Sequence, residues 1–436
     1  MSPLPLVAST FLVCLTVCAI PSLASPSTTQ SVRSSITDFG AVGNGTTLNT
    51  EAIQKTIDHL ATSGGGAVVI PEGVFLSGAI FLKAGVDLEL EKNAVLKGST
   101  NIADYPISKT RIEGHFQPWL PALVNADHVD HLRISGEGTL DGSGKPFWDE
   151  FRRRIAADRS TKNLDVPRPR LVFIEYCNDA QVIGLHFKDS GFWNLHVFHC
   201  HDCLISGLDI SAGASSPSTD GMDIDSSQNI TIQNCHISVN DDCICLKGSK
   251  GPFAMDDKDS PPVEHIRVSD CRFARGGSVL TVGSEATIVR DVVVEHCTVE
   301  PTATRGLSMV RLKLRPDTPQ NYSDIHFRDI TLSGAGQLIS VAPWKQYFDL
   351  QGQPSPARSV RDVTISNITG SFGGFGTIQG NTGDVIDNIL LENIDVKLTN
   401  PAPKIVGVTD FVVKNVKING TEYGGPTPST QTTTSP

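Results

Sequence analysis

The sequence predicts an all-β protein, a single-stranded right-handed parallel β-helix (a solenoid) with a short N-terminal capping helix. Three observations predict this class. Short β-like runs recur in a common frame, no helical pattern separates them, and 39 glycines occur in 436 residues without a polar linker in the middle of the chain. Parallel strands of βαβ units need crossover helices, so the missing helical periodicity favours stacked coils.

The repeat is clearest in eight runs: LISGLD, TIQNCH, RVSDCR, VVEHCT, HFRDIT, TISNIT, LLENID and VVKNVK. Their equivalent apolar residues are Leu208, Cys235, Cys271, Cys297, Ile330, Ile368, Ile394 and Val416, at intervals of 27, 36, 26, 33, 38, 26 and 22 residues. The short intervals of 22 to 26 residues hold three short strands, and the longer ones carry insertions. Because stacked coils lie about 4.8 Å apart, equivalent positions should form ladders of Cys, Asn and Ile.

A helix is predicted in the stretch NTEAIQKTIDHLATSGGG, where the exposed first coil needs a cap against edge pairing. Ile53, Ile57 and Leu60 share one helical face. Asn49 or Thr50 is suited to begin the helix, and the glycines 64–66 are suited to end it.

The two ends of the chain are predicted to lie outside the catalytic domain. Residues 1–24 carry no charge, contain an apolar run too short to span a bilayer and end in small residues, which predicts a secretory signal peptide. Residues 25–423 are expected to form one β-helix domain, and 424–436 a disordered Ser/Thr/Pro-rich tail. Five glycosylation sequons agree with secretion to the extracellular space: Asn44, Asn229, Asn321, Asn367 and Asn419.

Charge and cysteine content restrict the partners. A net charge of -11 argues against nucleic acid and acidic membranes, so we expect a monomer that binds neither. Eight of the ten cysteines lie after residue 24, which predicts two to four disulfides in a secreted protein. The cluster HCHDC, residues 199–203, does not match zinc-site spacing, so no metal or cofactor is expected.

Acidic residues crowd into one region, STDGMDIDSSQNITIQNCHISVNDDCICLKG, residues 218–248. Apolar pairs recur there as Met222 with Ile224, Ile244 with Leu246, and later Leu280 with Val282. Aligning these pairs places Asp220, Asp242 and Ser278 at equivalent positions on successive coils. Asp241 and Asp242 precede a strand, where a bend is expected to present both to solvent. For Asp223 and Asp225, a structural role in turns and a functional role are equally good explanations.

Three clustered carboxylates, Asp220, Asp241 and Asp242, repel one another and therefore indicate a function. Crowding raises one pKa and yields a proton donor beside ionised neighbours, which is what cleavage of a glycosidic bond requires. In MVRLKLRP, Arg311 and Lys313 alternate with apolar residues and so point away from the core. The cations and the carboxylates are predicted to share one groove.

These elements resemble the polygalacturonase family of pectin-degrading glycoside hydrolases, family 28, over essentially the whole mature chain. The family's N-T-D, D-D, G-H-G and R-I-K elements appear in order as Ser218-Thr219-Asp220, Asn240-Asp241-Asp242, Gly277-Ser278-Val279 and Arg311-Leu312-Lys313. The resemblance implies that Asp241 is the general acid and that Asp220 and Asp242 activate water in an inverting hydrolysis. It also implies that Arg311 and Lys313 bind the substrate carboxylate, for which the arginine fork is well suited.

Ser278 departs from the family, whose polygalacturonases carry His at this position. A hydroxyl does not titrate near neutral pH, so we expect Ser278 to contact substrate without the role of the imidazole. The departure and the stretch APWKQYFDLQG, residues 342–352, resemble rhamnogalacturonan-active or exo-acting branches instead. Trp344 and Tyr347 form either a sugar platform or the packing beneath a loop.

Two other functions use the same solenoid. A calcium-dependent polysaccharide lyase would bind Ca²⁺ at the Asp cluster and use Arg311 as the base. A non-catalytic carbohydrate-binding solenoid would have lost activity together with the histidine. All three carboxylates and both cations remain, so hydrolysis of α-galacturonosyl linkages is the favoured hypothesis.

Overall fold

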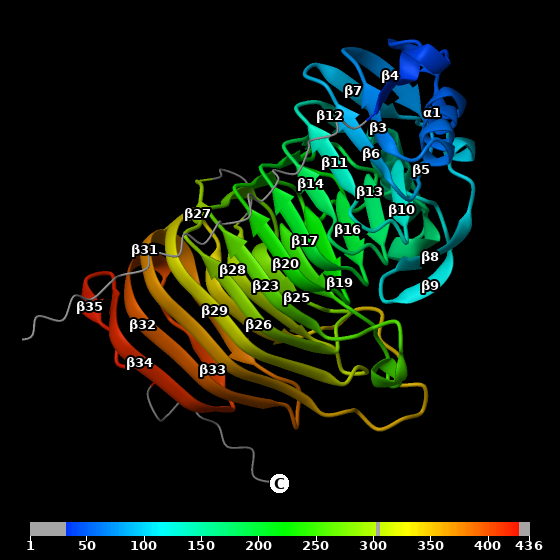
Figure 1. The fold of residues 1–436 in the computed structure, drawn as a ribbon. Coiled ribbons are helices and arrows are strands. Elements are labelled where there is room, and N and C mark those ends of the chain that lie inside the picture. Colours follow the sequence, from blue (N-terminus) through cyan, green and yellow to red (C-terminus); the bar gives the residue numbers. More distant parts are fainter. Residues whose placement is uncertain (1–31, 302–305, 427–436) are drawn as a thin grey trace, which may run out of the picture. The chain divides into compact units, whose positions relative to one another are not determined.

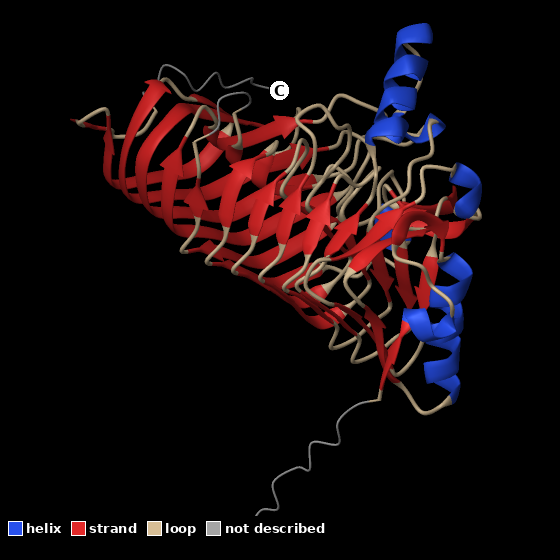
Figure 2. Cartoon of the chain, turned by 90° about the horizontal axis from the view of Figure 1, so that it is seen from above, coloured by secondary structure: helices blue, strands red, loops and turns tan. Residues whose placement is uncertain are grey.

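The computed structural model describes residues 32–301 and 306–426. The predicted signal peptide and residues 427–436 of the predicted tail lie outside this part. The described residues form a right-handed parallel β-helix, as the repeat predicts, in which successive coils stack their strands into three parallel ladders (Figures 1 and 2).

The first ladder, here called the cleft ladder, carries the functional residues. Its strands pair in parallel with their neighbours in the order β5, β10, β13, β16, β19, β22, β25, β28 and β30. Their bounds are Ile80–Leu82, Val124–Asp127, Val172–Glu175, Leu195–Phe198, Met222–Asp225, Ile244–Lys247, Ser278–Val282, Ser308–Leu314 and Gln337–Pro343. The ladder continues through β31 (Arg358–Gln379) to β33 (Lys404–Val406).

The second ladder runs the length of the solenoid. It contains β1, β3, β6, β11, β14, β17, β20, β23, β26, β29, β31, β32 and β34. Apart from β31, the bounds are Arg33–Ser35, Gly66–Ile70, Val86–Leu90, Arg133–Gly136, Gln181–Ile183, His201–Ser206, Gln228–Gln233, Val263–Ser269, Ile288–Glu295, Gln320–Ser333, Val385–Asn400 and Val408–Ile418. A short antiparallel strand, β35 (Thr421–Glu422), ends it.

The third ladder contains β2, β4, β7, β12, β15, β18, β21, β24 and β27 and merges into β29. The bounds are Asn44–Leu48, Gly73–Ser77, Ala94–Gly98, Thr139–Asp141, His186–Lys188, Asp209–Ser211, His236–Ser238, Arg272–Arg275 and Thr298–Val299. The observed registers advance by the predicted intervals, for example from Gln228 to Glu264 and from Ile368 to Ile394. The sequence therefore predicted the coil boundaries correctly over this half of the chain.

Interior side chains form continuous apolar rows between the ladders. Ile368, Ile394 and Val416 pair in register and are at most 2% exposed. The predicted disulfides are wrong for the described residues, because all eight of their cysteines are buried free thiols. Cys235, Cys271 and Cys297 instead fill equivalent interior positions on successive coils, where a thiol packs as a small apolar side chain.

Helix α1 (Thr50–Thr62) covers the first coil, and Ile53, Ile57 and Leu60 are fully buried beneath it. Asn49 precedes the helix, but its side-chain Oδ1 accepts a bond from the Val42 amide instead of capping the helix. A second helix, α2 (Lys145–Ala157), and four 3₁₀ turns (Ile36–Phe39, Ile102–Asp104, Asn163–Asp165 and Ala254–Asp256) lie in the connections. Among the described residues neither helix has the length and apolarity needed to span a bilayer.

One connection leaves the solenoid pattern altogether. Strands β8 (Ser108–Ile112) and β9 (His115–Trp119) form an antiparallel hairpin on the N-terminal half of the chain. Arg111 of this hairpin donates through Nε to Asp225 at 3.1 Å, on the outward face of β19 in the cleft ladder. The hairpin therefore covers part of the cleft ladder and helps to shape the site described next.

Candidate active site

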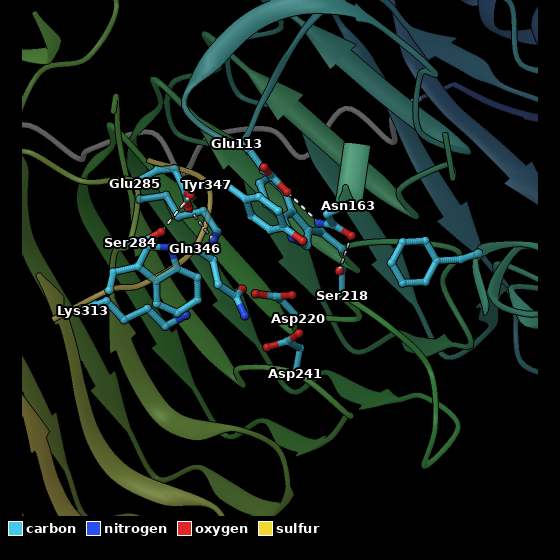
Figure 3. A pocket seen from close by; sticks show the side chains of 14 residues that line it. Glu113, Asn163, Ser218, Asp220, Asp241, Ser284, Glu285, Lys313, Gln346 and Tyr347 are labelled. Carbon is cyan, nitrogen blue, oxygen red and sulfur yellow. Dashed lines mark hydrogen bonds and ion pairs between the residues drawn. The ribbon is translucent and has the colours of Figure 1, made fainter. Parts of the chain in front are cut away.

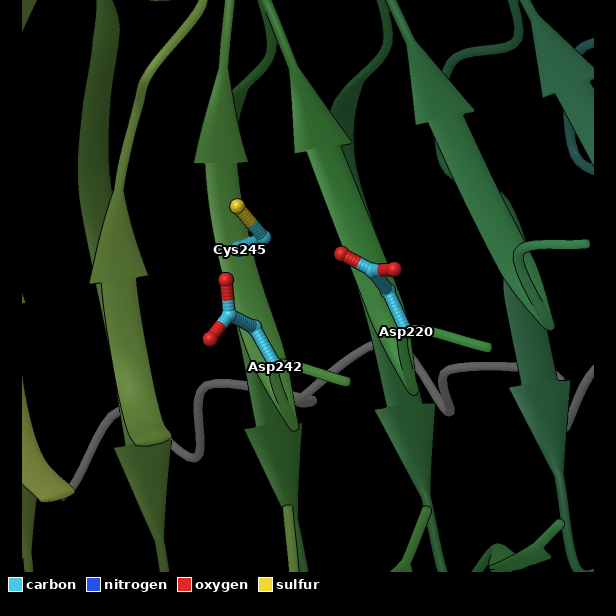
Figure 4. A group of neighbouring side chains, drawn as sticks. All are labelled: Asp220, Asp242 and Cys245. Carbon is cyan, nitrogen blue, oxygen red and sulfur yellow. The ribbon is translucent and has the colours of Figure 1, made fainter. Parts of the chain in front are cut away.

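Asp220, Asp242 and Ser278 lie on neighbouring rungs of the cleft ladder, as the alignment predicts. Met222 pairs with Ile244, and Ile244 pairs with Leu280. The backbone amide of Gly221 donates to the Asp242 carbonyl at 2.9 Å, which fixes the two rungs together. Carboxylate oxygens of Asp220 and Asp242 and the thiol of Cys245 lie within 4.8 Å of one another (Figure 4).

Asp242 is placed differently from the prediction. Its side chain is only 1% exposed, so the expected bend does not present it to solvent. Lys313 Nζ lies 2.8 Å from its Oδ2 and Arg311 Nη1 lies 3.5 Å from its Oδ1. Burial opposes ionisation, but Lys313 and Arg311 outweigh it and hold the pKa of Asp242 well below its ordinary value. Asp242 is therefore a fixed negative charge behind the cleft.

Asp220 and Asp241 line a cleft of about 250 Å³, where their carboxyl groups face one another (Figure 3). The remaining lining residues are Glu113, Phe151, Asn163, Trp193, Ser218, Lys247, Ser284, Glu285, Lys313, Trp344, Gln346 and Tyr347. Burial, with the nearby charges of Asp223 and Asp241, raises the pKa of Asp220 well above its ordinary value. The pKa values of Asp220 and Asp242, on adjacent strands, are thus shifted in opposite directions. The shift favours the protonated form of Asp220 and the ionised form of Asp242.

The two predicted cations, Arg311 and Lys313, lie at different places relative to the cleft. Both alternate with Val310, Leu312 and Leu314, which are buried in the core as predicted. Lys313 lines the cleft, and its ammonium also lies 5.0 Å from the centre of the Trp344 ring. Arg311 contacts Asp242 from outside the cleft lining, and its side chain is 34% exposed.

Ser278 has no exposed surface, so the structure does not place it in contact with a ligand in the cleft. Its hydroxyl donates to Asp242 Oδ1 at 3.1 Å and shares a short hydrogen bond with the Thr281 hydroxyl. Ser278 therefore helps to hold the Asp242 carboxylate in place and does not line the cleft. Tyr347, in contrast, lines the cleft with a residue exposure of 53%, and its carbonyl accepts a 2.6 Å bond from Arg315.

Asp223 and Asp225 are both fully buried on the outward face of β19, where Arg111 of the β8–β9 hairpin lies against Asp225 and Lys247 lies against Asp223. Arg111 outweighs the effect of burial and lowers the pKa of Asp225, which makes this carboxylate a structural anchor for the hairpin. Burial, partly offset by Lys247, raises the pKa of Asp223 to about 8. Asp223 lies 3.5 Å from Lys247 and does not line the cleft.

Several cleft residues were not predicted from the sequence. Lys247 lines the cleft, is 6% exposed and lies 3.7 Å from Glu285 and 4.7 Å from the centre of the Trp193 ring. Alternation in CICLKG places Lys247 on the same face as Asp223 and Cys245 of the ladder, so this signal was present. Glu113 and Asn163 lie in insertions that do not follow the coil repeat. Their positions relative to the strands therefore could not be predicted from the sequence.

A carboxyl group with a raised pKa in the cleft and one with a lowered pKa directly behind it, beside lysines and aromatic rings, form an acid/base arrangement suited to glycosidic bonds. Comparison with known proteins agrees with this chemistry. The model of the family described as Glycosyl hydrolases family 28 matches residues 63–417. Because this match covers most of the sequence, the chain belongs to glycosyl hydrolase family 28 and is a glycoside hydrolase.

Several relatives share moderate identity with the chain. A probable polygalacturonase from Vitis vinifera is 27% identical over 391 residues, which cover 85% of this chain and 75% of the relative. An exopolygalacturonase from Zea mays is 27% identical over 354 residues, covering 77% and 76%. Among solved structures, the hyperthermoactive exopolygalacturonase from Thermotoga maritima has a TM-score of 0.75 at 24% identity, covering 90% of this chain and 93% of that one. The structural likeness supports the fold.

Proposed function

We propose that the protein is a secreted, monomeric hydrolase that cleaves α-galacturonosyl linkages of pectin with inversion. The observation that carries this proposal is the cleft itself. Asp220 and Asp241 face each other there, Asp242 lies directly behind, and Lys247 and Lys313 supply the positive charge that a uronate substrate needs. The names of the curated relatives, polygalacturonase and exopolygalacturonase, support the same substrate class.

Asp241 is the proton donor to the leaving oxygen, because it lines the cleft and is half-buried, whereas Asp220 and Asp242 are buried. Asp220 and Asp242 act as a pair that holds one proton and one negative charge, since burial favours the proton on Asp220 and Lys313 favours the anion at Asp242. The pair orients a water molecule and accepts its proton as that water attacks the anomeric carbon. Ser278 helps to fix the ionised member of the pair.

Binding of the uronate carboxylate falls to the lysines that line the cleft. Lys313 already pairs with Asp242 at 2.8 Å, whereas Lys247 has carboxylates only at 3.5 and 3.7 Å and keeps donors for a ligand. Trp193, Trp344 and Tyr347 border the same space and offer aromatic faces to sugar rings. Arg311 acts mainly on Asp242, so its effect on binding is indirect.

Digestion of polygalacturonate, rhamnogalacturonan and xylogalacturonan side by side tests the proposal. We expect new reducing ends without unsaturated, ultraviolet-absorbing products, and no effect of a chelator. Unsaturated products lost on chelation would show a lyase and overturn the hydrolytic mechanism. Binding without turnover on all three polymers would show a carbohydrate-binding protein. The fastest substrate identifies the backbone.

A further inference from the structure

Two insertions build the opposite walls of the cleft at the strand ends of the cleft ladder. On one side, the hairpin tip at Gly114 packs tightly on the segment after β22, where a Cβ on Gly114 would lie 2.9 Å from the Gly248 carbonyl oxygen. On the other side, Arg168 donates to the Pro217 carbonyl at 3.1 Å, before β19 begins. The walls therefore stand at the carboxyl and amino ends of the same parallel strands.

A hydrogen bond joins these walls across the cleft. Asn163 Nδ2 donates to Glu113 Oε1 at 2.6 Å, and this bond lies beside Asp220 and Asp241 in Figure 3. Each of the two residues also contacts a neighbour in its own wall. Ser218 donates to Asn163 Oδ1 at 3.1 Å, and Lys250 Nζ lies 3.5 Å from Glu113 Oε2. Glu113 and Lys250 are about 85% buried.

The Glu113–Asn163 bond joins walls at opposite ends of the cleft-ladder strands, so it lies across the direction in which the coils stack. Among the other lining residues, Trp193 lies just before β16, Lys313 lies in β28, and Trp344 and Tyr347 follow β30. The cleft volume of about 250 Å³ is smaller than the 300–1,000 Å³ typical of sites for drug-sized ligands. There is room for the end of a sugar chain, and a continuous chain would have to pass through the Glu113–Asn163 bond.

We propose that Glu113 and Asn163 form a crossbar that restricts this enzyme to chain ends and sets the length of the released product. The proposal rests on the hydrolytic function proposed above. Glu113 determines specificity without taking part in proton transfer. Its carboxylate offers an acceptor for the hydroxyl groups of the terminal sugar and repels a further uronate beyond the bar.

Product sizing and viscosity measurements during early digestion of polygalacturonate test the crossbar. For the wild type we expect one short product from the first minutes and little loss of viscosity per bond cleaved. Glu113→Ala and Asn163→Ala each open the bar, so the products should become a series of oligomers and viscosity should fall faster per reducing end. Glu113→Gln keeps an acceptor for Asn163 Nδ2 and should retain the short product.

Glu392→Ala, on β32 and outside the cleft lining, is the matched control and should behave as the wild type. Using both alanine variants keeps the test valid if one of them fails to fold. A mixture of oligomers from the wild type, or unchanged products from folded alanine variants, would overturn the crossbar. Absence of cleavage by the wild type on every pectic polymer would instead refute the proposed function, so the two failures are distinct.

Discussion

The C-terminal coils of the second ladder and the catalytic coils of the cleft ladder use the same stacking of parallel strands for opposite purposes. In β31, β32 and β34 like side chains stack on like, with Ile368, Ile394 and Val416 inside and an asparagine ladder outside. In β19 and β22 the outward positions instead hold groups of opposite charge that compensate each other between strands, such as Asp223 with Lys247. Repetition stabilises the solenoid, and function resides where repetition is interrupted.

The largest effect should come from the catalytic coils. Asp241→Asn removes the proton donor while changing little volume, so kcat should fall by about 10²–10⁴. Initial rates on the best substrate from the polymer panel measure this loss, with the melting temperature as a folding check. Asn393→Ala, in the C-terminal asparagine ladder, is the control and should leave kcat unchanged. Near-normal turnover of Asp241→Asn would show that another group donates the proton.

Lys313→Met tests whether the charges of the catalytic coils compensate one another. The change leaves Asp242 buried with Arg311 at 3.5 Å as the cation in contact and with the hydrogen bond from Ser278. Breaking a buried pair costs about 3–5 kcal/mol in unfolding free energy. Urea denaturation at neutral pH measures the loss. The double variant Lys313→Met/Asp242→Asn should recover part of it, because the uncompensated charge is then gone. Equal destabilisation of both variants would contradict the pairing.

Ile394→Ala changes the repetitive C-terminal coils and leaves the catalytic coils unaltered. Removing this buried side chain leaves a cavity between Ile368 and Val416, which costs about 2–5 kcal/mol in unfolding free energy. Activity per folded molecule should not change. A fall in kcat at temperatures where the variant is fully folded would mean that the two regions are coupled.

The smallest effect concerns Glu175, which lies on the cleft ladder outside the cleft lining. Burial, with the nearby Asp127, raises its pKa to about 7. The folded chain therefore keeps a proton that the unfolded chain has lost. This contribution to stability is complete below the unfolded pKa, near 4.5, and disappears as pH rises to 7. Glu175→Gln should remove a decline of up to about 1.4 kcal/mol per pH unit.

Unfolding free energies of the wild type and Glu175→Gln between pH 4.5 and 7.5 give this slope directly. Glu392→Gln, at a half-buried position of β32, should keep the wild-type slope. If the Glu175→Gln slope equals that of the wild type, this carboxyl group titrates at its ordinary pKa in the folded protein.

The repetitive features of the fold were predictable from the sequence, because each coil repeats the same physical requirement. The apolar frame determined the register of Leu208 through Val416, and it placed Asp220 beside Asp242. The same frame could not predict the burial of Asp242, which depends on the positions of the Arg311 and Lys313 side chains. The cysteines occupy interior apolar positions as free thiols. Their even number was therefore not sufficient to predict disulfides.

The cleft walls could not be predicted because they come from insertions. Glu113 and Asn163 lie in segments without a periodic partner, and their contact joins residues fifty positions apart. Asp223 and Asp225 show the same effect, because alternation alone would expose them. The hairpin contributes Arg111, which pairs with Asp225 and Asp257. Insertions thus convert a regular surface into a site.

The most direct test of the account is the double variant Asp241→Asn/Asp242→Asn, measured beside both single variants. If the three carboxyl groups act as one catalytic unit, the double variant should be about as slow as the slower single variant, because each loss already disables the unit. Independent groups would give a double loss equal to the product of the two single losses. That multiplicative result would contradict the shared reaction centre.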